Sequence, residues 1–346
     1  MNRANESAHS PLRVAILGYG WVARDYMLPA MLASTYVRPV AISALKETEM
    51  EDCPNSIRRF TNWRRMIEEM DLDAVYIATP NFVHREQAEF CLERGVHVLC
   101  EKPMATTLSD AEAMIGAAER SGKVYATAYD QRFHPAHRAM YELVQAGKLG
   151  TLTQIRLDYA CWLPKTWCAD NWRIDRTRAG GGAIIDLAPH GLDLIELISG
   201  KQIEQLEVFA QTAVQDYAVD DGGILVARLQ NEVLASLHVG YNRPDAFPRR
   251  RLEFIGTEGM LVATNTMGQT PGGTVTHYDT RTGTATAIEF STQTSPFLQQ
   301  IDSFARSIRN EQIPLRSPSD DLRLTGLLYH ELKRLEATDP VHSTSI

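Results

Sequence analysis

The stretch LRVAILGYGWVA (residues 12–23) decides the fold of the first half of the chain. LRVAILG is a continuous apolar run rather than an alternating one, which is typical of a strand covered on both faces. The run ends in a G-x-G-x-x-A pattern, and a helical pattern follows directly. A glycine-rich turn between a strand and a helix predicts a binding turn for a dinucleotide.

The small residues of this turn have separate physical roles. Gly18 permits the tight turn, Gly20 lets a pyrophosphate approach the backbone, and Ala23 lets the helix pack closely on the strand. The helix amino-terminus adds N–H donors and the positive end of the helix dipole. A structural glycine turn without a ligand is the alternative. The expected contacts to NAD(P) from this turn are Gly18, Gly20, Trp21, Val22 and Ala23.

The strand and helix patterns continue to alternate after this turn. Repetition at this pitch predicts a parallel, doubly wound sheet, and therefore an α/β domain of the Rossmann type over residues 11–129. Pro29 is expected to kink or restart the first helix. Ser109 and Glu112 have the spacing of a capping box at the start of a later helix. The further apolar runs lie at residues 36–44, 73–80, 96–102 and 123–129.

The end of the second apolar run bears on the choice between NAD and NADP. An acid at this point would bind the ribose hydroxyls and repel a 2′-phosphate. The chain instead reads Ser43-Ala44-Leu45-Lys46, with no acid before Glu47. The missing acid and the nearby Lys46 favour NADP(H), with Ala44 and Lys46 as cofactor contacts. The alternative is that Lys46 is an ordinary solvated lysine and the chain binds NAD(H).

Composition limits the classes of protein and partner. A chain of 346 residues exceeds one average domain, so two are expected. A net charge of −8 argues against a surface for nucleic acid or for an anionic membrane. The five cysteines lack a C-x-x-C pair and indicate reduced thiols in a cytoplasmic protein, with no metal site. The polar opening predicts no secretion signal and a disordered tail over residues 1–10.

The second half changes to alternation with a period of two. Such alternation predicts antiparallel strands with one buried face. Asn231-Glu232 is expected to form a hairpin turn between two of these strands. Phe297, Ile301, Phe304 and Ile308 form one helical stripe for core packing, and residues 322–337 predict a closing helix after the turn-rich 317–321. The expected strands lie at residues 225–230, 233–239, 251–256 and 285–290.

Four motifs then occur in a fixed order. They are GYGWVA (18–23), ATPNFVH (78–84), EKP (101–103) and GGGAIIDLAPHGLDL (180–194). With them the chain resembles the glucose–fructose oxidoreductase / inositol dehydrogenase / rhizopine-catabolism (Gfo/Idh/MocA) family, from about residue 12 to 336. The resemblance implies a second domain over residues 130–340, an α+β domain with a large open, mostly antiparallel sheet that binds substrate and pairs subunits.

The resemblance also implies roles for residues in the motifs. Thr79, Pro80, Asn81 and His84 would line the path of the cofactor, and Glu101 would lie near its ribose. Lys102 would meet the substrate hydroxyl. The physical reasoning agrees, because EKP follows a buried strand and ligands of open α/β sheets bind at the carboxyl ends of the strands. An exposed Glu101–Lys102 salt bridge is the alternative.

Two further segments are expected to reach the substrate. The family often has an asparagine where this chain has Asp130, two residues before Arg132. This departure puts the usual contact in doubt and bears on substrate choice. Trp172 and Arg173 resemble the W-R pair that precedes the glycine run of the family, although aromatic packing is an alternative role for Trp172.

The D-x-x-x-H motif suits proton transfer. Oxidation of a secondary alcohol removes a hydroxyl proton while a hydride leaves carbon, and histidine is the usual base. Asp186 and His190 are four residues apart and share a face if they lie on a helix. We expect His190 as general acid/base, Asp186 as its partner and Lys102 as the group that stabilises the alkoxide. The alternatives are that Asp186 caps a helix starting near Leu187, with Pro189 in its first turn, and that His190 is a core histidine.

These observations predict a cytoplasmic NAD(P)-dependent oxidoreductase. It would interconvert a secondary alcohol and a ketone, or an anomeric hydroxyl and a lactone, on a sugar, cyclitol or related polyol. The expected partners are that small molecule and further copies of the chain, as a homodimer or homotetramer through the second sheet. The rival functions are a glycosidase that oxidises its substrate transiently through NAD, and a non-catalytic nucleotide sensor.

Overall fold

The structure is a computed structural model that describes residues 10–167, 170–312 and 314–338. Apart from Ser10, the expected disordered tail lies outside the described residues, and so does Cys168. The four cysteines that are described carry free thiols. Within the described ranges, every helix is too short or too polar to traverse a bilayer.

Contacts divide the chain into two compact units. Unit 1 comprises residues 1–128 and 297–322, and unit 2 comprises residues 129–296 and 323–346. The sequence predicts a division into 11–129 and 130–340, so the structure differs in grouping 297–322 with unit 1. The reason is the apolar stripe of helix α8 (Pro296–Ile308), because Phe297, Ile301 and Phe304 are buried in the core of unit 1.

Unit 1 is built on a six-stranded parallel sheet in the order β3-β2-β1-β4-β5-β6. This order is that of a dinucleotide-binding sheet, and it reverses between β1 and β4, where such sheets open a ligand crevice. The predicted parallel sheet is confirmed. The sequence missed β3, which is three residues long and too short to show a period. The strands are β1 (Leu12–Leu17), β2 (Val37–Ser43), β3 (Arg58–Phe60), β4 (Ala74–Ile77), β5 (His97–Glu101) and β6 (Tyr125–Ala128).

Helices connect these strands, and their ends follow the sequence only in part. A π-helical segment over Ala23–Met27 passes into α1 at Leu28, with Pro29 in the first turn, so the predicted restart is confirmed. The capping box at Ser109 and Glu112 is wrong. Thr107 caps α4 by accepting a bond from the Asp110 amide at 3.1 Å, because its extended backbone presents the hydroxyl to that amide. The other helices are α2 (Trp63–Glu69), α3 (His84–Glu93) and α4 (Leu108–Ser121).

Unit 2 contains an eight-stranded, mostly antiparallel sheet in the order β14-β13-β12-β11-β7-β10-β9-β8. Only the β7–β10 pair among these strands is parallel. The predicted open sheet is confirmed, and Asn231 and Glu232 form the hairpin turn with positive φ. The prediction for 285–290 is too long, because β14 stops at Ala287. The strands are β7 (Leu152–Ala160), β8 (Ile203–Gln211), β9 (Gly222–Leu229), β10 (Leu234–Gly240), β11 (Arg250–Gly256), β12 (Gly259–Thr264), β13 (Thr274–Asp279) and β14 (Thr284–Ala287).

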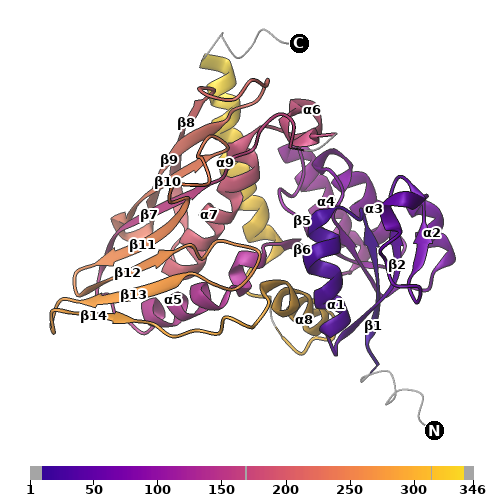
Figure 1. Cartoon of the computed structure of the whole chain (residues 1–346), viewed down its shortest axis with the longest axis horizontal. Coiled ribbons are helices and arrows are strands. Elements are labelled where there is room, and N and C mark those ends of the chain that lie inside the picture. The colour runs from indigo at the N-terminus through magenta and orange to yellow at the C-terminus, as the bar shows by residue number, and fades with distance from the viewer. Residues whose placement is uncertain (1–9, 168–169, 313, 339–346) are drawn as a thin grey trace. The chain divides into compact units, whose positions relative to one another are not determined.

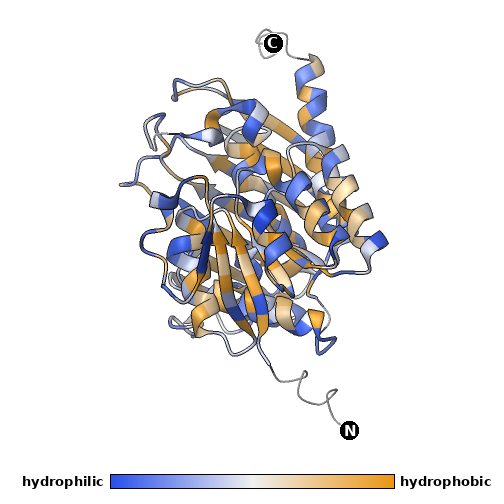
Figure 2. Ribbon diagram, turned by 90° about the vertical axis from the view of Figure 1, so that its right-hand side faces the viewer, coloured by the Kyte–Doolittle hydropathy of each residue, from blue (hydrophilic) through white to orange (hydrophobic). Residues whose placement is uncertain are grey.

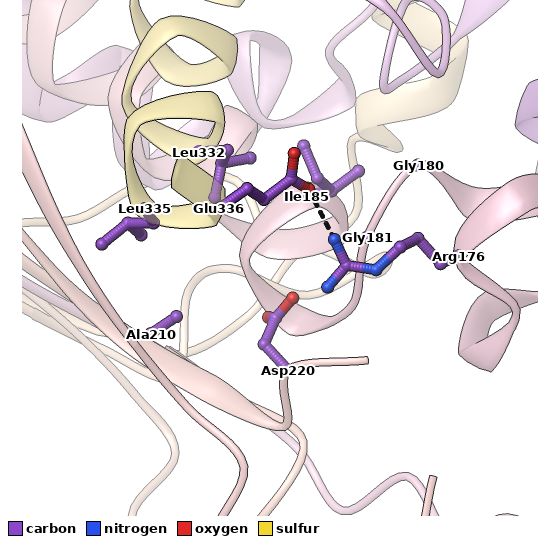
Figure 3. A pocket seen from close by; sticks show the side chains of 9 residues that line it. All are labelled: Arg176, Gly180, Gly181, Ile185, Ala210, Asp220, Leu332, Leu335 and Glu336. Carbon is purple, nitrogen blue, oxygen red and sulfur yellow. Dashed lines mark hydrogen bonds and ion pairs between the residues drawn. The ribbon is translucent and has the colours of Figure 1, made fainter. Parts of the chain in front are cut away.

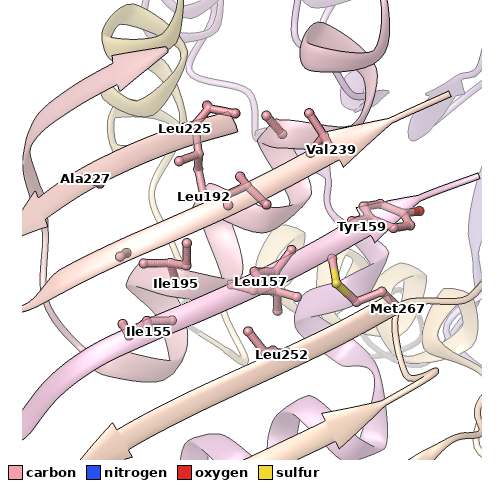
Figure 4. Close-up of a cluster of buried hydrophobic side chains, with 14 of the residues drawn as sticks. Ile155, Leu157, Tyr159, Leu192, Ile195, Leu225, Ala227, Val239, Leu252 and Met267 are labelled. Carbon is pink, nitrogen blue, oxygen red and sulfur yellow. The ribbon is translucent and has the colours of Figure 1, made fainter. Parts of the chain in front are cut away.

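Helices cover one face of this sheet (Figure 1). Figure 4 shows side chains of β7, β9 and β10 pointing toward Leu192 and Ile195 of α7. α9 begins at Pro318 inside the expected turn, and its blue and orange residues mark it as amphipathic (Figure 2). The helices are α5 (Pro135–Gln145), α6 (Arg176–Ala179), α7 (Ala183–Ser199) and α9 (Pro318–Thr338), with 3-10 turns at Asp130–Phe133 and Trp172–Ile174.

A buried histidine pair lies at the start of α5. The rings of His134 and His137 are 4.8 Å apart, and His137 contacts the Gln131 carbonyl and the Thr266 hydroxyl. Burial lowers the pKa of His134 to about 4 and that of His137 to about 3. Both rings are therefore neutral in the folded protein at neutral pH.

This pair predicts acid sensitivity. Between pH 6.5 and about 4 the unfolded chain binds more protons than the folded protein, so stability falls as pH falls. At pH 5 the loss is about 2 kcal/mol per buried histidine. Urea midpoints at pH 7 and pH 5 check this, because His137→Gln should lose less between them than wild type. The exposed His330→Gln is the control, and an equal loss in all three proteins would contradict the prediction.

Candidate active site

The two glycines of the first turn differ in what surrounds them. Gly18 has φ +88° and donates its amide to the Ser43 carbonyl at 3.0 Å, and a Cβ added there would lie 2.7 Å from the Ala78 carbonyl oxygen. A Cβ added at Gly20 would meet nothing within 4 Å. Ala23 is fully buried. The fold itself requires Gly18, whereas Gly20 leaves an open cradle of bare backbone at the end of β1, which fits a pyrophosphate.

The end of β2 lies beside this turn. The Ala44 amide donates to the Phe60 carbonyl at 3.2 Å, which fixes the loop. Leu45 is 86% exposed, and Lys46 is also exposed. Trp21 and Val22 are half-buried at the start of the following helix.

The loops after β4 and β5 are joined by a buried histidine. His84 is fully buried, with Nδ1 3.1 Å from the Pro103 carbonyl and Nε2 2.9 Å from the Thr79 carbonyl. Burial lowers the pKa of His84. A neutral ring carries one N–H, so it donates to one of these carbonyls and packs against the other. The Thr79 hydroxyl donates to Gln87 at 2.7 Å, Pro80 is half-buried, and Asn81 is buried. His84 therefore holds the ATPN and EKP loops together.

Glu101 and Lys102 end β5 and are both half-buried. The Tyr76 hydroxyl donates to Glu101 Oε1 at 2.5 Å, and Tyr76 is fully buried on β4. The Lys102 amide donates to Glu101 Oε2 at 3.3 Å, and the Lys102–Pro103 bond is cis. Sequence analysis missed Tyr76, because it lies inside an apolar strand where a tyrosine is ordinary core.

In unit 2, α7 carries the D-x-x-x-H motif on its first two turns. Asp186 is half-buried and accepts a bond from the Tyr241 hydroxyl at 2.6 Å. His190 is buried, with Nδ1 3.8 Å from Asp130 Oδ1. Gly191 follows it, and a Cβ there would lie 2.8 Å from the Leu237 side chain, so the glycine allows α7 to pack closely on β10.

Aromatic rings and acids surround the imidazole. The rings of Tyr129 and Tyr159 meet the His190 ring edge-on at 6.0 and 5.9 Å. Burial, and then the nearby Asp186, raises the pKa of Tyr241, and burial raises that of Tyr159, so both phenols stay protonated. The His190 imidazole, with Nδ1 facing Asp130, is placed to exchange a proton with a bound substrate.

The suggestion that Asp186 caps the helix is wrong. α7 begins at Ala183, so Asp186 lies in its first turn and Pro189 lies inside the helix. The caps come instead from Asp220, whose carboxylate accepts the amides of Gly182 and Ile184 at 2.8 Å. Sequence analysis missed Asp220 and Tyr241, because each reaches α7 from a segment more than thirty residues away.

Arg132 and Asp193 form a buried ion pair. Arg132 Nε lies 3.0 and 2.9 Å from the two carboxylate oxygens, and a terminal nitrogen lies 2.8 Å from Oδ1. Both side chains are buried, and the guanidinium lies 4.4 Å from the centre of the Tyr129 ring. The structure thus places the predicted substrate residue Arg132 in a contact that joins the turn at 130–133 to α7.

Trp172 and Arg173 lie half-buried in the turn before α6. The Arg173 guanidinium lies 4.5 Å from the centre of the Trp172 ring and 5.2 Å from that of Trp167. Its charge also acts on Tyr241, lowering the pKa of that phenol against the larger effect of burial. Arg173 is therefore electrostatically connected to the Tyr241–Asp186 pair.

Two family descriptions match the chain. Residues 12–129 match "Oxidoreductase family, NAD-binding Rossmann fold", and residues 137–262 match "GFO/IDH/MocA C-terminal domain". The chain belongs to the Gfo/Idh/MocA oxidoreductase family. The predicted resemblance and the predicted enzyme class, a dehydrogenase or reductase, are confirmed.

The relatives of this Gfo/Idh/MocA protein include enzymes named for reactions on sugars. It is 33% identical over 267 residues to 1,5-anhydro-D-fructose reductase of Ensifer adhaerens, covering 76% of this chain and 79% of the relative. It is 27% identical over 227 residues to levoglucosan dehydrogenase of Pseudarthrobacter phenanthrenivorans, covering 61% and 57%. The crystal structure of aldose-aldose oxidoreductase from Caulobacter crescentus with glycerol shares the fold, with a TM-score of 0.82, 24% identity and coverage of 94% and 98%.

Proposed function

We propose that this chain transfers a hydride between NAD(P) and a secondary alcohol or ketone, or an anomeric hydroxyl or lactone, of a sugar, cyclitol or related polyol. The observation that carries the proposal is the setting of His190. This buried imidazole lies on α7, the helix that also carries Asp186, and its Nδ1 is 3.8 Å from the Asp130 carboxylate. The sugar-related names of the relatives support the substrate class.

In this proposal, the residues of the chain manage the proton and the substrate oxygen. The bound nicotinamide supplies the hydride acceptor or donor. His190 takes the hydroxyl proton at a ring nitrogen, and Asp186 orients the substrate or the imidazole. Lys102 donates a hydrogen bond to the same oxygen and stabilises the negative charge that develops there. Asp130, Arg132, Trp172 and Arg173 complete the proposed substrate set.

The proposed cofactor contacts on unit 1 are those predicted from sequence. Glu101, held by Tyr76, would face the ribose, and His84 would act by holding the two loops that carry Thr79, Pro80 and Lys102. We propose NADP(H) as the preferred cofactor, because Lys46 is exposed where an acid would repel the 2′-phosphate. Fluorescence titration with NADH and with NADPH tests this preference, and tighter binding of NADH would overturn it.

The two glycines give a matched test of cofactor binding. Gly20→Ala places a methyl group in open space, so stability should change by less than about 0.5 kcal/mol. The dissociation constant of NAD(P)H should rise about 10- to 100-fold, because the methyl group obstructs the pyrophosphate. Gly18→Ala should instead cost about 1–3 kcal/mol of stability through its positive φ. Unchanged cofactor affinity in a folded Gly20→Ala protein would contradict the prediction.

The activity itself is tested with the wild-type protein. A panel of aldoses, cyclitols and sugar lactones is incubated with NAD(P)⁺ or NAD(P)H, and the absorbance of the reduced nicotinamide is followed. The proposal expects steady-state oxidation or reduction with at least one of these polyols. Hydrolysis of a nitrophenyl glycoside without net change of cofactor would indicate the transient-oxidation glycosidase instead. Cofactor binding without any turnover would indicate the nucleotide sensor.

We also propose that two or four copies associate through the outer face of the unit 2 sheet. This face carries exposed apolar side chains on adjacent strands, with Phe209 of β8 61% exposed, Ile224 of β9 48% and Leu234 of β10 53%. Ile224→Asp should yield monomers in sedimentation, whereas Leu45→Asp on unit 1 should not. A monomeric wild-type protein would overturn the proposal.

We propose a cytoplasmic location, which the free thiols support. Cell fractionation tests it.

A further inference from the structure

The first two turns of α7 carry both proposed proton-handling residues but have few supports of their own. The residue before the helix is Gly182, which has no side chain to cap the free amides. Pro189 lies inside the helix and has no N–H, so the second turn lacks one hydrogen bond of the helical ladder. Asp186 and His190 therefore need to be positioned from outside the helix.

Asp220 supplies this support from the loop between β8 and β9. Its Oδ1 accepts the Gly182 amide at 2.8 Å, and its Oδ2 accepts the Ile184 amide at 2.8 Å. Its main-chain carbonyl accepts the Ala183 amide at 3.1 Å. Three successive amides at the start of α7 are thus bound by one buried residue. Burial raises the pKa of its carboxyl group, and the hydrogen bonds from the Ile184 and Gly182 amides oppose this effect.

The fit around this contact explains two of the three glycines in the run. A Cβ at Gly182 would lie 2.0 Å from the Asp220 carbonyl oxygen, and one at Gly181 would lie 2.7 Å from the Ile185 side chain. Figure 3 shows Asp220 beside this run, next to Arg176, which is ion-paired with Glu336 at 2.5 Å. No side chain larger than hydrogen fits at Gly182 while Asp220 keeps its place.

Asp221, the residue after Asp220, supports the tyrosine that contacts Asp186. Asp221 accepts the Tyr241 amide through its main-chain carbonyl at 2.7 Å, and the Tyr241 hydroxyl bonds Asp186 at 2.6 Å. Asp221 Oδ2 also accepts the amides of Ala213, Val214 and Gln215, which fixes the loop. The dipeptide Asp220-Asp221 therefore anchors both the start of α7 and the tyrosine that contacts Asp186.

We infer that Asp220 is a positioning residue for the reaction: by binding the amides of residues 182–184 it sets the place of Asp186 and His190. The inference rests on the proposed function. This role of Asp220 differs from that of an ordinary helix cap, because loss of the contact should displace Asp186 and His190 as well as lower the stability of the protein. A misplacement of about 1 Å can cost about 100-fold in rate.

The test compares two changes made on opposite sides of the same contact. Asp220→Ala and Gly182→Ala should each lower kcat about 10- to 100-fold. The Michaelis constant and the dissociation constant of NAD(P)H should stay within about twofold of wild type. The double variant should be no slower than the slower single variant, because both changes break one contact. Asp220→Asn keeps one acceptor oxygen and should recover part of the rate.

The control is Leu261→Ala, a fully buried core truncation on β12 of the same unit. Leu261→Ala should lower the melting temperature while keeping kcat. If Asp220→Ala, Asp220→Asn and Gly182→Ala lower the melting temperature but keep kcat, Asp220 is a structural cap and the inference is wrong.

A second measurement does not depend on activity. The His190 ring contacts two tyrosine rings edge-on, so its proton resonances carry ring-current shifts that report its position. These resonances should move in Asp220→Asn and stay in place in Leu261→Ala. Unmoved His190 resonances in a folded Asp220→Asn would overturn the inference. Absence of turnover by the wild-type protein with every polyol of the panel would overturn the proposed function, whereas these shifts would still decide the placement by Asp220.

Discussion

His190→Ala should lose about 10²- to 10⁴-fold in kcat while its cofactor affinity stays near that of wild type. The imidazole is buried beside Asp130 and contacts the rings of Tyr129 and Tyr159, so its removal takes the proposed proton acceptor out of the site. Steady-state rates with the best polyol of the panel, together with NAD(P)H titration, measure both quantities.

Lys102→Ala should lower kcat by a factor in the same range, because the change removes the charge proposed to stabilise the alkoxide.

The loss of kcat in His190→Ala should shrink as pH rises, since the substrate hydroxyl then loses its proton more easily to solvent base. The exposed His330→Ala serves as the matched control and should keep full turnover. Full turnover in both Lys102→Ala and His190→Ala would remove the proposed mechanism.

Asp193→Ala should destabilise the protein by about 3–5 kcal/mol. The change leaves the Arg132 guanidinium buried without the carboxylate that binds it through three short N···O contacts. Removal of one partner of a buried ion pair costs far more than loss of an exposed pair. The urea midpoint measures the change, and it should fall with little change in slope.

Two further variants test whether the effect comes from burial of this ion pair. Asp245→Ala removes the carboxylate of an exposed pair with Arg249 and should cost less than about 1 kcal/mol. The double variant Arg132→Met with Asp193→Leu replaces the pair by apolar groups and should recover much of the loss. Equal stability of Asp193→Ala and Asp245→Ala would contradict the prediction.

Local patterns were sufficient to predict the parallel sheet apart from β3, and to predict β9, β10, β11 and part of β14 in the second sheet, but they missed β7, β8, β12 and β13. Continuous apolar runs gave the parallel strands, and alternation gave the one-faced strands, because burial on two faces or on one leaves different periods. Leu225 and Leu237, for example, both face the core as their alternation predicts. The D-x-x-x-H spacing likewise placed Asp186 and His190 on one helix.

Contacts between distant segments could not be predicted in the same way. Asp220 caps a helix that begins 37 residues earlier in the chain, and no period or motif in the loop at 212–221 signals it. Tyr76 and Tyr241 lie in or next to strands, where an aromatic residue has an ordinary packing role. Arg132 matches a family motif, but only the three-dimensional structure shows that Asp193 binds it.

The return of residues 297–322 to unit 1 has a consequence for how the protein is made. On the ribosome, the whole of unit 2 up to residue 296 emerges before α8 can cover the apolar surface that Phe297, Ile301 and Phe304 share with the first core. A fragment cut at residue 129 would leave that surface facing water and would tend to aggregate. An isolated nucleotide-binding half should therefore be designed by joining residue 128 to the 297–322 segment with a flexible linker.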